Sequence, residues 1–235
     1  MSESKSQVIR VFIAVLLGLF VLFASAFMAI IGTGFIPESI GFFAEIPFLT
    51  HSGMLVLSTL IIWFLTKGKL SDYGFKKPID VDLARIIMLA VSVGIIVALF
   101  RSFLAGGWGG SAEDSFSIQI IIGIWLYASI AEEVLTRGLV QGHLKPLAKK
   151  GMTIFDARIS VPVLIGALFF GLMHIAMVTL GVDLVSVAAT VISAFVVGII
   201  AGYYCEKTES LVPAILVHML FNVTGSLVFF LGGLF

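Results

Sequence analysis

The chain has 235 residues, of which 60% are hydrophobic and 12% are charged, and its 14 lysines and arginines balance 14 aspartates and glutamates. So few polar side chains cannot cover a water-soluble globule, which excludes the soluble classes of protein. The chain also has no phosphate-binding glycine loop and no basic stripe, so no nucleic-acid partner is expected. The composition predicts an integral membrane protein surrounded by membrane lipid.

Seven apolar runs are each long enough to cross about 30 Å of hydrocarbon. In chain order they lie at residues 8–31, 46–66, 83–104, 116–142, 159–180, 184–204 and 211–235. The first run has a basic start like that of a signal peptide, but it extends over more than about twenty residues, so we interpret it as an anchor. Short connections and the lack of a fixed-period repeat predict one all-α polytopic membrane domain over residues 1–235.

Lysines and arginines mark every second connection between these runs. They are Lys5 and Arg10, then Lys67, Lys69, Lys76, Lys77 and Arg85, then Lys145, Lys149, Lys150 and Arg158, and finally Lys207. The intervening connections carry Glu38, Glu45, Glu113, Asp114 and Asp183, with only Arg101 near them. Because positive residues are enriched in cytoplasmic loops, this pattern predicts a cytoplasmic amino terminus, and we expect the plasma membrane as its location.

The fourth run contains the stretch SIAEEVLTRGLVQGHL, in which Glu132 and Glu133 are the only pair of acids well inside a predicted span. Each charge at mid-membrane costs about 2.5 to 3.5 kcal/mol, so both carboxylates need partners or a wet cavity. Arg137 lies one helical turn after Glu133, where the two side chains can pair. Glu132 then points toward another helix or a cavity, where it can act as a general base. A structural ion cluster that fixes helix packing is the alternative.

Two later runs carry isolated polar residues: His174 in the fifth, and His218 with Asn222 in the seventh. A helical rise of about 1.5 Å per residue places Glu132, His218 and Asn222 roughly 11 to 17 Å from the inner boundary, and His174 roughly 22 Å from it. Since helices tilt, all four side chains can meet in one layer. A lone membrane histidine often serves packing alone, but this convergence favours a functional site.

Small residues recur at every fourth position of the sixth run, at Ala194, Gly198 and Gly202. This spacing places them on one helix face and favours close contact with a neighbouring helix. Cys205, the single cysteine, has no cysteine partner and no adjacent histidine. We interpret it as a buried structural thiol.

Three motifs carry the polar residues: E-E-x-x-x-R at Glu132, Glu133 and Arg137, F-x-x-x-H at Phe170 and His174, and H-x-x-x-N at His218 and Asn222. In this order they resemble the CPBP family of intramembrane proteases, also called the Abi family, which includes the Ras-converting CAAX endopeptidases. The resemblance implies a catalytic core at about residues 116–235 and an endopeptidase that cuts hydrophobic or prenylated membrane-associated substrates. It also implies that Glu132 and His174 activate water, that His218 and Asn222 form the oxyanion site, and that Glu133 and Arg137 support them.

Other chemistries stay open at this point. No H-E-x-x-H, G-x-G-D or G-x-S-G motif is present, so water is the expected nucleophile and no cofactor is expected. A zinc ion held by Glu132, His174 and His218 is the alternative within the enzyme class. Two further alternatives are a proton- or cation-coupled transporter that uses the same acids and histidines, and a noncatalytic immunity protein that binds a hydrophobic peptide.

Overall fold

Seven helices in the described part of the chain are long and apolar enough to cross a membrane, which confirms the predicted span count and an integral membrane protein. The computed structural model describes residues 3–37, 41, 43–104, 117–154 and 157–232. Glu38, Glu113, Asp114, residue 116 and residues 233–235 lie outside these ranges. The helices are α1 (Glu3–Thr33), α2 (Ile46–Thr66), α3 (Leu83–Leu104), a fourth helical stretch (Gln119–Gln141), α5 (Val161–Met173), α6 (Leu184–Thr208) and α7 (Leu211–Gly232).

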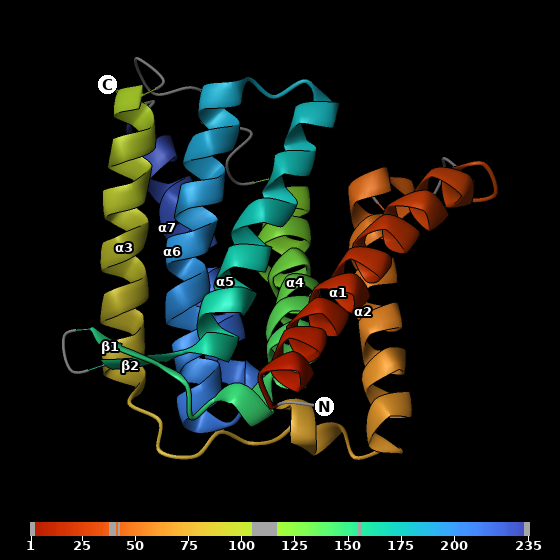
Figure 1. Ribbon diagram of the computed structural model, residues 1–235. Coiled ribbons are helices and arrows are strands. Elements are labelled where there is room, and N and C mark those ends of the chain that lie inside the picture. Colours follow the sequence, from red (N-terminus) through yellow and green to blue (C-terminus); the bar gives the residue numbers. More distant parts are fainter. Residues whose placement is uncertain (1–2, 38–40, 42, 105–116, 155–156, 233–235) are drawn as a thin grey trace.

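The helices run alongside one another, and α1 begins at the opposite end of the bundle from the end of α7 (Figure 1). Helix α1 crosses α2 at an angle, α3 packs on α7, and α6 packs on both α5 and α7. An odd number of spans places the two termini on opposite sides of a membrane. The arrangement therefore agrees with a chain that crosses the bilayer seven times.

The fourth helical stretch is the centre of the bundle. Its Leu135 and Leu139 join one buried apolar cluster with residues of α1 and α2, while Val134 joins a second cluster with residues of α3, α6 and α7. Every residue of Val134–Gln141 is buried. Neighbouring helices therefore enclose the part of this stretch that comes after Glu132 and Glu133 in the sequence.

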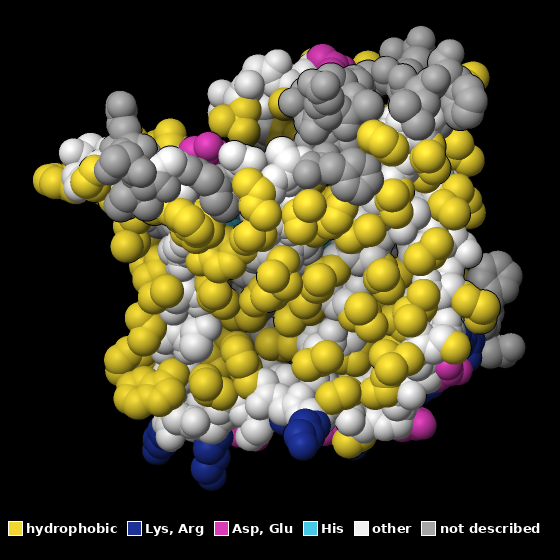
Figure 2. All heavy atoms as spheres, turned by 180° about the vertical axis from the view of Figure 1, so that it is seen from behind, with side chains coloured by type: hydrophobic (Ala, Val, Ile, Leu, Met, Phe, Trp, Pro, Cys, Tyr) yellow, Lys and Arg dark blue, Asp and Glu magenta, His cyan; other side chains and the backbone are white. Residues whose placement is uncertain are grey.

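The outer surface has the distribution expected of a protein whose solvent is lipid. Hydrophobic side chains cover most of the face shown in Figure 2, and lysine and arginine side chains gather at its lower end, where α1 begins in Figure 1. Phe64 and Phe103 are 71% and 81% exposed, which would be unfavourable in water but is expected against hydrocarbon.

The fifth span differs from its predicted bounds of 159–180. Before it, β1 (Gly151–Ile154) and β2 (Ala157–Ser160) pair as antiparallel strands, which the sequence analysis missed. Ser160 caps α5, because its side chain accepts a hydrogen bond from the backbone N–H of Val163, and Pro162 favours the first helical turn. The helix therefore begins at Val161, and it continues after Met173 as the 3₁₀ segment η7 (His174–Leu180).

The small residues of α6 permit close contact, as their spacing predicted. A Cβ atom added at Gly198 would lie 2.9 Å from Cα of Ala167 on α5 and 3.2 Å from Nη2 of Arg137. At Gly202 it would lie 2.8 Å from Oε1 of Gln141. The face of α6 that carries Gly198 and Gly202 therefore leaves room for the α5 backbone and for polar side chains of the fourth helical stretch.

We expect Gly198→Ala to lower the free energy of unfolding by about 1 to 3 kcal/mol, because the Ala167 backbone cannot rotate away from the added methyl group. Reversible unfolding in mixed detergent micelles measures this change. The matched control is Gly225→Ala on α7, where a Cβ atom meets nothing within 4 Å. Equal stability of the two variants would contradict the packing described here.

Candidate active site

The two adjacent glutamates lie where the fourth helical stretch changes its winding. A short α-helical segment, α4 (Ser129–Glu133), joins two π-helical segments, η4 (Gln119–Ala128) and η5 (Val134–Gln141). Wider π-helical turns inside α-helices occur frequently at functional sites. Glu132 and Glu133 thus end the α-helical segment, in the interior of a membrane span.

Glu133 is fully buried and has two partners. Nη1 of Arg137 donates a hydrogen bond to its Oε1 at 2.9 Å, which confirms the predicted pair one turn apart. Nδ1 of His218 on α7 lies 3.0 Å from the same oxygen. Arg137 is also buried, with Cζ 4.5 Å from the ring centroid of Phe170, a cation–π contact. The buried charges of Glu133 and Arg137 therefore contact each other, and they also contact His218 on α7 and the ring of Phe170 on α5.

Glu132 points toward two other helices. Its Oε1 lies 3.1 Å from Nε2 of His51 on α2, and its Oε2 lies 3.7 Å from Nε2 of His218 on α7. The side chain of Glu132 is 13% exposed, whereas that of Glu133 is not exposed at all. The two carboxylates are thus in different environments, and Glu132 is the one with accessible surface.

The other two predicted residues lie beside this cluster. His174 begins η7, and the ring of Phe170 contacts both His174 and His218, with centroids 5.1 and 5.2 Å apart. Asn222 is one turn after His218 on α7, and its Nδ2 donates to Oγ of Ser129 at 3.2 Å and to the carbonyl oxygen of Ile124 at 3.4 Å. The structure therefore brings Glu132, Glu133 and His218 into direct contact and places His174 and Asn222 around them.

Three histidines of the site present Nε2 as their reactive nitrogen. Nδ1 of His51 lies 2.7 Å from the carbonyl oxygen of Pro47, and Nδ1 of His174 lies 2.8 Å from that of Phe170. Nδ1 of His218 faces Glu133, which accepts from Arg137 as a carboxylate. Carbonyl and carboxylate oxygens only accept, so Nδ1 is the protonated nitrogen in each ring. Each Nε2 is then left to accept a proton or, in the imidazolium, to donate one.

Sequence reasoning missed His51. It is one of four histidines in the chain and lies inside the second apolar run, so an intramembrane polar residue was the available signal. Its role was hidden because its partner Glu132 is 81 residues away in the sequence.

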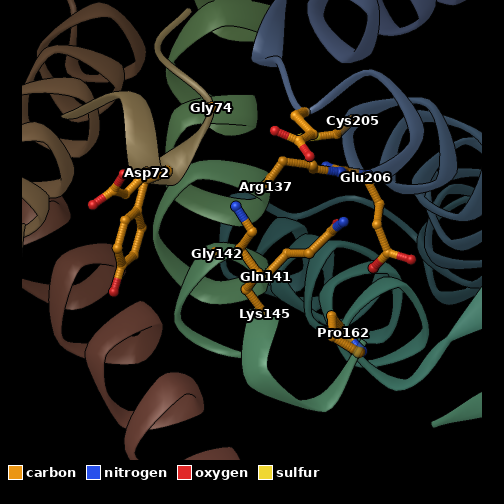
Figure 3. A pocket seen from close by; sticks show the side chains of 11 residues that line it. Asp72, Gly74, Arg137, Gln141, Gly142, Lys145, Pro162, Cys205 and Glu206 are labelled. Carbon is orange, nitrogen blue, oxygen red and sulfur yellow. The ribbon is translucent and has the colours of Figure 1, made fainter. Parts of the chain in front are cut away.

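A small polar pocket reaches the buried arginine from the basic end of the molecule. Arg137 and Gln141 from the fourth helical stretch and Cys205 and Glu206 from α6 point toward a common space (Figure 3). Its volume of about 60 Å³ is large enough to hold water. Nε and Nη2 of Arg137 and Oε1 of Gln141 lack a protein partner among the described residues, so water in this pocket can satisfy them.

The three residues of the zinc alternative, Glu132, His174 and His218, are not grouped as a metal site in the part of the chain that the structure describes. Within residues 3–37, 41, 43–104, 117–154 and 157–232, no three His, Cys, Asp or Glu side chains are grouped so that they could hold a metal ion. Glu132 and His218 approach each other, while Nδ1 of His174 faces a backbone carbonyl and leaves its Nε2 available. Zinc binding by Glu132, His174 and His218 therefore remains an alternative, which a chelator experiment can test.

The fold and the cluster together define a polytopic helical membrane protein with a carboxylate–histidine site inside the membrane. A family model described as Rce1-like, type II CAAX prenyl endopeptidase Rce1-like, matches residues 114–224. The match includes all three motifs and confirms the resemblance of this segment to CAAX-type intramembrane proteases. Searches of curated proteins and of solved structures gave no match. His51 lies outside the matched segment.

Proposed function

We propose that this protein is an intramembrane endopeptidase in which Glu132 activates water for attack on a peptide bond. The observation that carries the proposal is the position of Glu132: half-buried within a membrane span, with one oxygen on His51 and the other facing His218. The family match supports the reaction class. A membrane-associated substrate fits a site that lies among membrane-spanning helices.

In the first step, Oε2 of Glu132 takes a proton from water while the water oxygen bonds to the scissile carbonyl carbon. Nδ1 of His174 donates to the carbonyl oxygen of Phe170. Nε2 of the same ring can therefore accept a hydrogen bond from this water and orient it. The tetrahedral intermediate then collapses and the carbon–nitrogen bond breaks. The proton held by Glu132 passes to the leaving amine, directly or through His174, so every proton is accounted for and no covalent enzyme intermediate forms.

The negative charge on the carbonyl oxygen needs hydrogen-bond donors. His218 as an imidazolium donates Nδ1–H to Glu133 and keeps Nε2–H for the oxyanion, and Glu133 with Glu132 balances its charge. Asn222 can donate a second hydrogen bond to the oxyanion from Nδ2. The substrate oxygen would then replace the carbonyl oxygen of Ile124, whose hydrogen bond to Nδ2 is the longer of two at 3.4 Å. Nη1 of Arg137 donates to the same oxygen of Glu133 as His218 does and holds that side chain in place.

The proposed substrate is a membrane-associated peptide with a hydrophobic or prenylated segment, and the proposed chemistry includes no metal ion. The test is cleavage by the purified protein in lipid, offered a farnesylated CAAX peptide and an unprenylated hydrophobic peptide. A zinc chelator is added in a parallel assay. Cleavage that survives the chelator supports the metal-free mechanism, and loss of cleavage that zinc restores supports the zinc alternative. No cleavage of either peptide would count against the protease proposal and favour a binding or transport function.

We also propose that the amino terminus faces the cytoplasm, on the basis of the lysine and arginine pattern. Single cysteines introduced in a Cys205→Ser background test this orientation. Lys77 lies in the basic connection between α2 and α3, and Leu180 is 77% exposed at the opposite end of the bundle. A membrane-impermeant maleimide should label Leu180→Cys in intact cells and Lys77→Cys only after the membrane is opened. The reverse labelling would show the opposite orientation.

A further inference from the structure

His51 stands out because it contacts the proposed catalytic carboxylate from a helix outside the matched segment. Its Nε2 lies 3.1 Å from Oε1 of Glu132, and its Nδ1 lies 2.7 Å from the carbonyl oxygen of Pro47, one turn earlier on α2. The imidazole side chain is 22% exposed. The ring is therefore held at both nitrogens and has one orientation available to it.

The two contacts restrict where protons lie. The Pro47 carbonyl oxygen can only accept, so Nδ1 carries a proton. The contact between Nε2 and Oε1 then needs one further proton, carried either by His51 as an imidazolium or by Glu132 as a carboxylic acid. The pair thus shares a single proton, and Oε1 of Glu132 is fully engaged.

We infer that His51 is a positioning residue that holds Oε1 of Glu132 and thereby directs Oε2 toward the reacting water. Oε2 faces His218 at 3.7 Å, too far for a direct hydrogen bond, on the side where the water and the scissile carbonyl would sit. This inference rests on the proposed function. It extends the site beyond the segment of residues 114–224, because α2 contributes to the placement of the base.

A purely structural role for His51 would be to join α2 to the fourth helical stretch. That junction has other contacts, since Oγ of Ser52 lies 2.7 Å from the hydroxyl oxygen of Tyr127 and the Phe48 ring stacks on Tyr127 with centroids 4.6 Å apart. Ser52→Ala removes one polar contact of the same junction without touching Glu132. It is therefore the matched control for a packing effect.

The kinetic test compares His51→Leu, His51→Gln and Ser52→Ala with the unchanged protein in the peptide-cleavage assay. We expect His51→Leu to lower kcat by about 100-fold with little change in KM, because the carboxylate loses its orientation. His51→Gln should recover part of the rate, since its amide nitrogen can still donate to Oε1. Ser52→Ala should keep the original rate. Unchanged kcat in His51→Leu, or equal rates in His51→Leu and His51→Gln, would overturn the inference.

A second readout does not depend on activity. In protein carrying ¹⁵N-labelled histidine, Glu132→Gln should shift the Nε2 resonance of His51 and leave that of His143 in place. If the protein cleaves no peptide but this shift occurs, the proposed reaction fails while the pairing of His51 with Glu132 stands. If the protein cleaves peptide and the His51 resonance does not respond to Glu132→Gln, the inference fails and the proposed function stands.

Discussion

Glu132→Gln should lower the rate of peptide cleavage by about 10²- to 10⁴-fold, the range that a positioned general base contributes. Glutamine has nearly the same shape, and its amide oxygen can take the place of Oε1 beside His51, but it cannot accept a proton from water. The folded structure should therefore survive while the chemical step fails. Initial rates in proteoliposomes over a range of peptide concentrations separate kcat from KM.

The control for this experiment is another carboxylate in the same chain. Glu209 lies between α6 and α7, where the hydrogen bond from Lys76 lowers its pKa, and its carboxylate pairs with Lys76 rather than with Glu132 or the histidines of the site. Glu209→Gln should cleave at the original rate. A Glu132→Gln protein that folds and retains most of its activity would exclude Glu132 as the base.

Arg137→Met should lower the free energy of unfolding by about 3 to 5 kcal/mol, the range found when one partner of a buried ion pair is removed. Both side chains of the Glu133–Arg137 pair are fully buried, so the remaining Glu133 charge would keep only His218 as a partner and would lose the guanidinium that balances it. The double variant Glu133→Gln with Arg137→Met removes both charges and should be more stable than Arg137→Met alone. Unfolding in mixed detergent micelles compares the three proteins.

An exposed ion pair provides the comparison. Lys76 and Glu209 form a pair whose side chains are 34% and 46% exposed. Lys76→Met should change the free energy of unfolding by less than about 1 kcal/mol, because solvent screens both charges. Similar losses in Lys76→Met and Arg137→Met would mean that burial of the Glu133–Arg137 pair does not determine its contribution.

The two experiments separate chemistry from stability at neighbouring positions. Glu132 is partly exposed and has only histidine partners, so its replacement affects the proton transfer first. Glu133 is buried and shares Oε1 between Arg137 and His218, so loss of Arg137 affects the fold and the placement of His218 together. Adjacent residues of the same type thus have different predicted consequences because their surroundings differ.

Several features follow from the sequence alone because they depend on near neighbours in the chain. The seven spans follow from the length and hydropathy of each run, which set whether a helix can cross hydrocarbon. The Glu133–Arg137 pair follows from a spacing of four residues, which fixes both side chains on one helix face. The family match also rests on local motifs within residues 114–224.

Only the tertiary structure decided which helices supply the partners of the two glutamates. His51 is 81 residues from Glu132 in the sequence, and His218 is 85 residues from Glu133. Both contacts form because α2 and α7 pack against the fourth helical stretch. Hydropathy could not reveal the pairing of β1 with β2 either, because each strand has only four residues and most of them precede the fifth apolar run. Helix formation is set by local chemistry, whereas the site is set by side-chain packing between helices that are distant in the sequence.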